Sequence, residues 1–357
     1  MTIIMNDKGD PYKSELIPDL HETEVSENLA KKSRKEIWWQ PKIDKKILKE
    51  LCKKRSWPGT YYTTMYFVAL IFCGYMAYTT WGTYWTVLWF WLYGTIYAFS
   101  GAYEHELRHR TFFKQRWLND LFQYIMSYMT FRETVFVRWA HAVHHSYTLQ
   151  TKDPHDYEIQ VDRPSKLFEF YMSVVPFGQL LWIHKSLLVQ TLKCSLGFIP
   201  KAVKETVPHK HIWKLKLNSR IQISFYLLVI FITIFYNTFL PVLFILLPYF
   251  YGNTFLFLVG LTQHAGLAWN VKDLRVNSRT VIFNPILSWL YCKMDYHIEH
   301  HVFPNVPWYN LSKLYEHIKD QLPKPNKGLI DAYLEIIPAV HKQAKDPNYI
   351  PKRIIPT

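Results

Sequence analysis

Two long stretches of this chain contain no charged residue and no histidine. The first runs from Ser56 to Tyr103 and the second from Ile221 to Gln263. About 20 apolar residues cross a hydrocarbon core of about 30 Å, so each stretch is long enough for two crossings. Turn residues divide both stretches, at Trp81-Gly82 and around 237–241. The pattern predicts two helical hairpins with four membrane spans, over residues 62–80, 83–103, 222–237 and 240–262.

The predicted fold is therefore an all-α integral membrane protein with a cytoplasmic helical cap. Residues 1–55 are predicted to form a cytoplasmic tail and a basic interfacial helix, residues 56–320 the membrane domain, and residues 321–357 a C-terminal cytoplasmic tail. Two further apolar segments, 117–131 and 167–183, are interrupted by charge or proline. We expect these two to lie in the membrane interface or to dip into it without crossing. The alternative is the buried helical core of a soluble protein, which rarely contains helices longer than 25 residues.

Basic residues indicate the orientation. Eleven Lys and Arg lie between Lys31 and Arg55, directly before the first predicted span, and the two hairpin turns carry none. The positive-inside bias places the N-terminus, the middle region and the C-terminus on the cytoplasmic side, in the plasma membrane or the endoplasmic reticulum. Basic flanks that meet anionic headgroups explain the net charge of +14, and no nucleic-acid-binding motif accompanies it. The first 30 residues are too polar for a signal peptide, and the four cysteines are scattered without a C-x-x-C pair, which argues against a disulfide framework.

The candidate chemistry lies in the histidines. Nine of the 16 fall into four clusters, two of which emerge directly from predicted spans. The clusters are His105 with His109, His141 with His144 and His145, His264 alone, and His297 with His300 and His301. All four lie on the side assigned to the cytoplasm. At this histidine frequency, one H-x-x-H-H pattern occurs in roughly 3% of shuffled chains and two in well under ~0.1%, so chance is a poor explanation.

The spacing allows these side chains to converge. Residues at i, i+3 and i+4 lie on one face of a helix, so His105 and His109 can share one ion, and each H-x-x-H-H pattern can offer three imidazoles to a shared centre. Neutral imidazole binds iron, copper and zinc. Nine ligands exceed the capacity of one metal, so the count predicts two ions. The other seven histidines are interpreted as ordinary surface or core residues.

Two other classes of protein compete with this interpretation. The sequence His105-Glu106-Leu107-Arg108-His109 also spells H-E-x-x-H, the zinc peptidase helix with glutamate as general base. A zinc site, however, gives no reason for two H-x-x-H-H patterns. A haem protein or metal transporter would place ligands near the bilayer midplane, where these spans have neither histidine nor carboxylate. A soluble-type di-iron carboxylate site needs two E-x-x-H motifs, and only Glu106 with His109 qualifies.

The histidine pattern resembles the integral membrane fatty acid desaturase and hydroxylase superfamily. Its three boxes, H-x(3–4)-H, H-x(2–3)-H-H and H/Q-x(2–3)-H-H, match the first, second and fourth clusters, and His264 is similar to an additional ligand found before the last box. The segments from Tyr147 to Glu158 and from Asp295 to Pro304 are similar to the residues around the second and third boxes. The resemblance covers roughly residues 60–320. It is closest to branch members described as hydrocarbon or rhizopine-type oxygenases.

The resemblance implies two non-haem iron ions held by the nine histidines, with O2 as cosubstrate. It implies oxidation of a C–H bond in a fatty-acyl, alkyl or other lipid chain, with desaturation preferred and hydroxylation as the alternative. The first box has three intervening residues, where many acyl-CoA desaturases have four. Neither a cytochrome b5-like nor a rubredoxin-like motif is present, so we expect a separate electron donor of the ferredoxin, rubredoxin or cytochrome b5 type, with its reductase. Candidate carboxylates for holding the imidazole N–H groups are Glu106 and Asp156, followed by Asp153, Asp295 and Glu299.

Overall fold

The computed structural model describes residues 38–150 and 161–356, and throughout these ranges the regular secondary structure is helical. Two isolated bridges, Thr280 with Tyr296 and Val281 with Asn326, are the extended pairings in this part of the chain. The all-α class is confirmed. The α-helices are α2 (Lys45–Leu51), α3 (Ser56–Thr79), α4 (Tyr84–Ala98), α5 (Ser100–Arg108), α6 (Arg116–Met129), α7 (Thr134–Ser146), α8 (Pro164–Ser173), α9 (Leu187–Ser195), α10 (Lys201–Thr206), α11 (Ile212–Phe235), α12 (Pro248–Gly252), α13 (Thr254–Leu261), α14 (Leu274–Asn277), α15 (Pro285–Leu290), α16 (His297–Val302), α17 (Leu311–Ile318) and α18 (Gly328–Lys345). Shorter helical turns are η1 (Gly178–Lys185), η2 (His209–His211), η3 (Val242–Leu246), η4 (Trp308–Asn310) and η5 (Lys319–Gln321).

The first charge-free stretch forms the expected hairpin. Helices α3 and α4 pack against each other and are joined at Gly82, whose φ of +83° suits a residue without a side chain. Helix α4 also packs against α12, and the two backbones meet at glycines. A Cβ atom added to Gly252 would lie 1.9 Å from the carbonyl carbon of Gly94. Only glycine at these positions permits such a close crossing.

The second charge-free stretch differs from the expectation in its return leg. Helix α11 is continuous, and the chain turns at Asn237, which has a positive φ of 47°. The return leg, predicted as one helix over 240–262, is divided into the π-helical turn η3 and the short helices α12 and α13. Pro241 and Pro248 precede or begin these pieces and cannot donate a backbone hydrogen bond to the preceding turn. The two prolines therefore account for the irregular start of the return leg and for the break before α12, whereas the break at Asn253 involves no proline.

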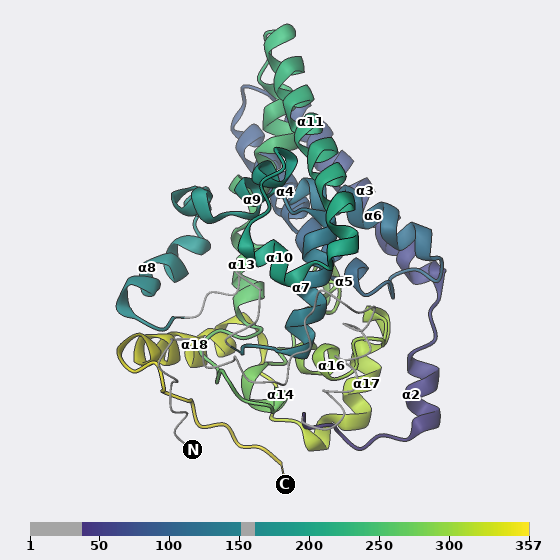
Figure 1. Ribbon diagram of the computed structural model, residues 1–357, viewed down its shortest axis with the longest axis vertical. Coiled ribbons are helices and arrows are strands. Elements are labelled where there is room, and N and C mark those ends of the chain that lie inside the picture. Colours follow the sequence, from purple (N-terminus) through teal and green to yellow (C-terminus); the bar gives the residue numbers. More distant parts are fainter. Residues whose placement is uncertain (1–37, 151–160, 357) are drawn as a thin grey trace.

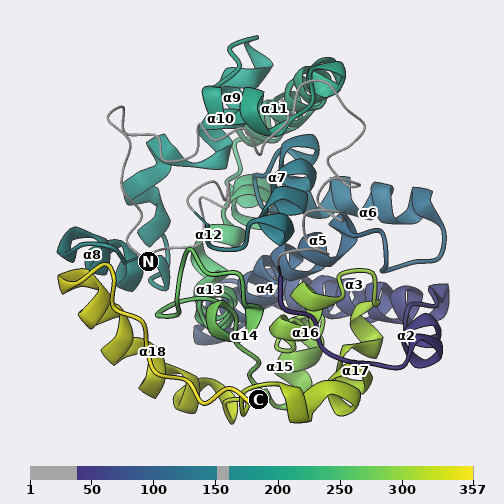
Figure 2. The same ribbon diagram turned by 60° about the horizontal axis from the view of Figure 1, so that its bottom comes forward.

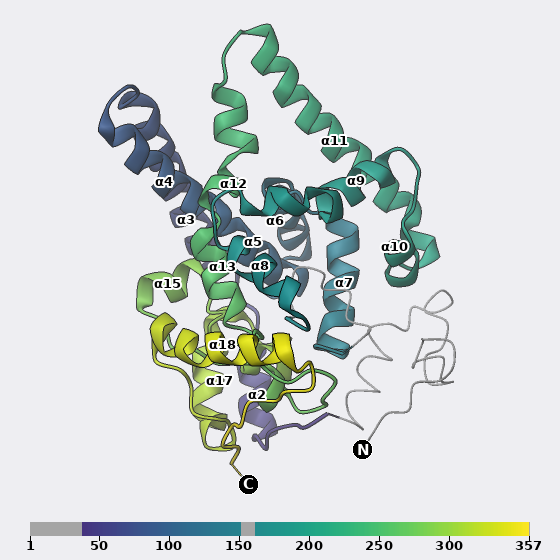
Figure 3. The same ribbon diagram turned by 90° about the vertical axis from the view of Figure 1, so that its left-hand side faces the viewer.

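Long apolar helices extend from one end of the molecule. Figure 3 shows α3, α4 and α11 reaching away from α2, α17 and α18, which lie at the other end. Within the described ranges, His209–Phe235 is the one helix that is long and apolar enough on its own to be a candidate membrane crossing. A second candidate is the pair Pro164–Ser173 and Gly178–Ser195, which is bent by 119°. The four-span arrangement therefore remains a prediction.

The opposite end is a cap built from both ends of the described chain (Figures 1 and 2). Helix α2 packs against α17, in a cluster where Leu51, Leu311 and Leu314 are buried. Helix α18 lies within residues 321–357, expected to be a peripheral tail, but it buries Ala332, Ile336 and Val340 in the main core. The C-terminal segment therefore contributes to the structure around the histidines.

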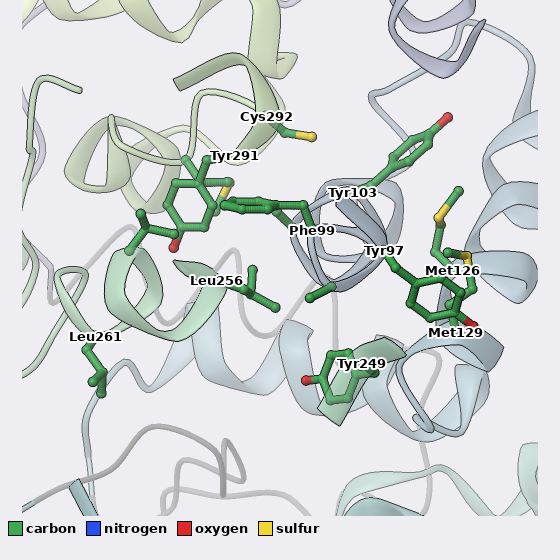
Figure 4. Close-up of a cluster of buried hydrophobic side chains, with 14 of the residues drawn as sticks. Tyr97, Phe99, Tyr103, Met126, Met129, Tyr249, Leu256, Leu261, Tyr291 and Cys292 are labelled. Carbon is green, nitrogen blue, oxygen red and sulfur yellow. The ribbon is translucent and has the colours of Figure 1, made fainter. Parts of the chain in front are cut away.

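The main core is unusually aromatic and joins the hairpins to the histidine-bearing helices. Figure 4 shows part of it, with side chains from α4, α5, α6, α12 and α13 meeting the link between α15 and α16. Tyr62 and Tyr103 are fully buried, with ring centroids 5.1 Å apart in an edge-to-face arrangement. Helix α5 continues α4 with only Phe99 between them, so the first two histidines stand directly beneath this core.

Candidate metal centre

Four separate parts of the chain bring the nine predicted histidines together. His105 lies on α5 and His109 ends that helix, α7 and α16 carry three histidines each, and His264 lies in the turn after α13. Seven of the nine are buried, and His105 and His109 are half-buried. Sequence reasoning therefore identified the side chains that converge.

The histidines form two groups, in each of which the facing nitrogens lie within 4.8 Å of one another. The five-histidine group comprises His105, His109, His141, His145 and His300. The four-histidine group comprises His144, His264, His297 and His301. The number of groups equals the number of ions predicted from the sequence.

Each H-x-x-H-H pattern is divided between the two groups, which differs from the expectation that its three imidazoles share one centre. On α7, His141 and His145 belong to the five-histidine group and His144 belongs to the other. On α16 the assignment is the opposite. His297 and His301 belong to the four-histidine group, and His300 belongs to the five-histidine group. Residues at i and i+4 lie almost above one another, whereas the residue at i+3 is rotated to the other side of that line. Each of these two helices therefore serves both groups.

The contacts between ring nitrogens are those of ligands around a cation. Nε2 of His297 lies 2.8 Å from Nε2 of His264 and 2.9 Å from Nε2 of His301. A ring nitrogen carries either one hydrogen or one lone pair, so at most one of these contacts can be a hydrogen bond. Metal–nitrogen bonds of about 2.0–2.1 Å at right angles would separate neighbouring nitrogens by roughly 3 Å. A metal ion accounts for the whole set of contacts.

The same spacing occurs in the five-histidine group. Nε2 of His141 lies 2.7 Å from Nε2 of His109 and 3.1 Å from Nε2 of His145. Nε2 of His105 lies 3.1 Å from Nε2 of His300. The convergence therefore repeats in both groups.

Hydrogen bonds on the outer nitrogens orient two of the rings. Nδ1 of His264 donates to the carbonyl oxygen of Asn277 at 2.7 Å. Thr148 donates its hydroxyl hydrogen to the carbonyl oxygen of His144 at 2.9 Å, so its oxygen accepts from Nδ1 of His301 at 3.1 Å. Both rings therefore carry their hydrogen on Nδ1 and point the Nε2 lone pair into the four-histidine group.

Burial also favours the neutral imidazoles that bind metals. It lowers the pKa of His264, His297 and His301 well below the usual range, and neighbouring histidines lower each pKa further. The pKa values of His105 and His141 in the five-histidine group are lowered for the same reasons. Unprotonated nitrogens are the form that coordinates an ion.

Glu106 lies on the outer side of the five-histidine group. Its Oε1 accepts hydrogen bonds from the hydroxyl of Thr111 at 2.8 Å and from the backbone N–H of Trp308 at 3.2 Å. Its Oε2 lies 3.7 Å from Nδ1 of His300, the nitrogen that faces away from the group. That distance is too long for the hydrogen bond to an imidazole N–H that was predicted for Glu106. Burial raises the pKa of Glu106 to about 8.

The other candidate carboxylates bond to hydroxyl groups. Glu299 accepts from Thr280 at 2.7 Å, and Asp295 accepts from Ser288 at 2.8 and 2.7 Å. These bonds connect α16, and Asp295 just before it, to neighbouring segments. Asp153 and Asp156 lie outside the described residues.

Sequence reasoning missed the groups that fix His264 in place. The guanidinium of Arg279 is buried and donates to the carbonyl oxygens of Thr262 at 2.7 Å and Ala265 at 3.2 Å, on either side of His264. It also pairs with Glu335 of α18 at 3.2 Å. Both Asn277 and Arg279 lie in a polar segment, 277–280, that directly follows the charged stretch 270–275, so no pattern in the sequence marks their role.

A cavity of about 100 Å³ lies against both groups and is here called the inner cavity. His105 of the five-histidine group and His264 of the four-histidine group both line it. Most of the remaining wall is apolar and includes Ala102, Leu256 and Leu261. Figure 4 shows Leu256 and Leu261 within the surrounding core. An apolar chain placed there would lie beside both candidate ions.

Comparison with known proteins is consistent with this centre. The family model described as "Fatty acid desaturase" matches residues 79–333, which include all nine histidines. A search of curated proteins found no match.

Proposed function

The chain belongs to the fatty acid desaturase family, and from that premise we propose that it is a membrane-bound, O2-dependent di-iron oxidoreductase acting on a lipid chain. The substrate is a fatty-acyl or other alkyl chain, and the favoured outcome is desaturation. Hydroxylation of the same C–H bonds is the alternative on this scaffold. The observation that carries the proposal is the convergence of nine imidazoles into two groups beside one apolar cavity.

The donor set suits iron. Each group offers only neutral imidazole nitrogens among the described residues, a ligand type that binds iron, copper and zinc, and the family is typically iron-dependent. The five-histidine group would hold one ion and the four-histidine group the other. Bound iron would supply the activation of O2 that removal of hydrogen from an unactivated C–H bond requires.

The residues of the chain bind and position the substrate. Leu256 and Leu261 line the inner cavity and exclude water from the carbon that reacts. Because His105 and His264 lie on the wall of the same cavity, the bound carbon chain is held against both groups at once. The outer-nitrogen bonds of His264 and His301 keep those rings aimed inward while the substrate enters.

We also propose the four-span topology with the centre on the cytoplasmic side. Large apolar side chains on the extended helices are largely exposed, including Ile71 on α3 at 68%, Val87 on α4 at 74% and Ile234 on α11 at 73%. Contiguous exposed apolar surface of this kind is expected to face lipid. A separate ferredoxin, rubredoxin or cytochrome b5 type protein, with its reductase, would deliver electrons to the cytoplasmic face.

The peptidase alternative receives no support from the position of Glu106. A general base must reach the metal-bound water, but this carboxylate lies behind His300 and is held by Thr111 and Trp308. Three further histidines accompany His105 and His109, whereas a catalytic zinc usually has three protein ligands in all.

Metal analysis and lipid mass spectrometry test the proposal. The protein would be expressed in membranes, purified for iron and zinc determination, and compared with cells lacking it for total lipids. We expect two irons for each chain, one for each group, and lipids with either a new double bond or an added oxygen. His144→Ala and His300→Ala should lose iron and product. His317→Ala, an exposed histidine of α17 outside both groups, should retain them. A single zinc for each chain, or unchanged lipids with full iron loading, would contradict the proposal.

A further inference from the structure

A second, larger cavity adjoins the inner one. Its volume is about 470 Å³, and the two cavities share Arg132 and Phe257 as wall residues. It lies beneath the bend between α8 and the segment formed by η1 and α9, and is here called the elbow cavity. A ligand in the elbow cavity could therefore extend past Arg132 and Phe257 toward the histidines.

The bent segment around this cavity has the character of an interfacial structure. The two arms meet at 119°, and the N–H of Phe177 in the bend donates to the carbonyl oxygen of Phe250 in α12 at 2.9 Å. Large apolar side chains of the segment are exposed, among them Phe168 and Leu181. An apolar segment fixed across the bundle in this way gives a lipid a lateral route from the bilayer.

The wall of the elbow cavity combines aromatic rings with excess positive charge. Arg132, Lys166 and Lys185 line it, against one carboxylate, Glu169. Lys166 is paired with Glu169 at 2.6 Å, and Arg132 with the buried Glu104 at 3.2 Å. Lys185 is partly open to solvent, and within the described ranges no carboxylate is paired with it. The cavity therefore offers a cation to a ligand.

A second donor points to the same kind of ligand. Nε2 of Gln179, also on the wall, is buried and has no hydrogen-bond partner in the part of the chain that the structure describes. A buried N–H group without an acceptor costs free energy, which a bound acceptor would recover. Gln179 and Lys185 lie near the two ends of η1, on either side of a kink at Trp182, and both line the elbow cavity.

We propose that the elbow cavity binds the anionic head of a single-chain amphiphile whose acyl chain enters the inner cavity. This inference rests on the proposed function and narrows its substrate from any lipid chain to an acyl chain ending in a carboxylate or a phosphate. Lys185 and Gln179 bind the head, Phe257 contacts the chain where the cavities meet, and the carbon that reacts lies beside His105 and His264. A neutral hydrocarbon would leave the buried amide nitrogen of Gln179 without an acceptor.

Binding of a fluorescent fatty acid tests this without turnover. The full chain would be placed in nanodiscs of zwitterionic lipid at about pH 8.5, where a carboxylic acid is ionised. The probes are cis-parinaric acid and its methyl ester. We expect the acid to bind about 10-fold more tightly than the ester, the size expected for one hydrogen bond to a charged group. Lys185→Gln should remove this preference, and Lys185→Arg should keep most of it.

The matched control is Lys193→Gln, which removes the same charge from an exposed position on α9 outside the cavity. It should bind both probes as the unmodified chain does. Equal affinity for acid and ester in the unmodified chain, or an unchanged preference in Lys185→Gln, would overturn the proposal.

Displacement of the fluorescent probe by competing lipids distinguishes a carboxylate head from a phosphate head. Together with the lipid analysis, it also separates the headgroup site from the proposed oxidoreductase function. Displacement of the probe by oleate identifies a carboxylate, and stronger displacement by oleoyl lysophosphatidic acid identifies a phosphate. Displacement by neither overturns the proposal. Charge-dependent binding with unmodified cellular lipids would contradict the oxidoreductase function alone. New lipid products with no effect of Lys185→Gln on binding would contradict the headgroup site alone.

Discussion

Nδ1 of His264 and the carbonyl oxygen of Asn277 lie 2.7 Å apart, although 13 residues separate them in the sequence. This bond fixes the hydrogen of His264 on the outer nitrogen, so the inner nitrogen presents its lone pair to the four-histidine group. Thr148 does the same for His301. The four-histidine group is therefore oriented by residues that bind no metal.

Thr148→Val is expected to weaken metal binding in the four-histidine group by about 10- to 100-fold, the usual effect of losing such an outer partner. The substitution removes the oxygen that accepts from Nδ1 of His301 while keeping the size of the side chain. Metal content after dialysis against increasing chelator would measure the change. Thr148→Ser keeps the hydroxyl and should behave as the unmodified chain does. Equal iron retention in the Val and Ser variants would contradict this role.

Arg279→Gln is expected to destabilise the protein by about 1–3 kcal/mol, since buried carbonyl oxygens lose their donor, whereas Glu335 keeps its ion pair with Arg353. The guanidinium holds the carbonyl oxygens of Thr262 and Ala265 and pairs with Glu335. Thermal unfolding in detergent would measure the loss. Lys319→Gln breaks an exposed ion pair with Glu316 and should leave the unfolding temperature unchanged. A small effect at Arg279 would show that the His264 turn holds its conformation independently.

The stability of the protein should depend on the protonation of Glu133. This residue caps α7, where its carboxylate accepts from the N–H of Phe136 at 2.6 Å and from the amide of Asn218 on α11. Burial raises the pKa of Glu133 from an ordinary value of 4.5 to about 7. The folded protein therefore holds this proton more tightly than the unfolded chain. The resulting stabilisation is complete below about pH 4.5 and is lost as the pH rises through about 7.

Glu133→Gln should remove that contribution. Between about pH 4.5 and pH 7, the free energy of unfolding of the unmodified chain should fall by about 3 kcal/mol more than that of the variant. Denaturant unfolding at a series of pH values would measure both. Parallel pH profiles would show that Glu133 is ionised in the folded protein at neutral pH.

Gly252→Ala should disrupt the crossing of α4 and α12. The added methyl carbon would lie 1.9 Å from a backbone carbon of Gly94, and no side-chain movement can relieve a clash with backbone. Forced overpacking of this kind costs about 1–3 kcal/mol or more. Size-exclusion profiles and unfolding temperatures would reveal it. Gly260→Ala, whose added methyl would meet only the Tyr291 hydroxyl oxygen, at 3.9 Å, serves as the control and should remain folded.

The sequence was sufficient to predict the helical class and the first hairpin from short-range spacing, and the nine histidines from the spacing within each cluster together with the predicted position of all four clusters on one side of the spans. The broken return leg was also visible in principle, since Pro241 and Pro248 interrupt the apolar run. The roles of Thr148, Asn277 and Arg279 could not be predicted, because their partners are brought to them only by the tertiary fold. No local pattern encodes such contacts.

The division of α7 and α16 between the two groups affects how the centre assembles. The two ions have separate ligands but share α7 and α16, so either helix, once ordered by one ion, presents its remaining nitrogens to the other. The first ion to bind meets the entropic cost of arranging both helices, and the second finds them already in place. Loading should therefore be cooperative, so that partly loaded preparations contain mainly empty and doubly filled molecules.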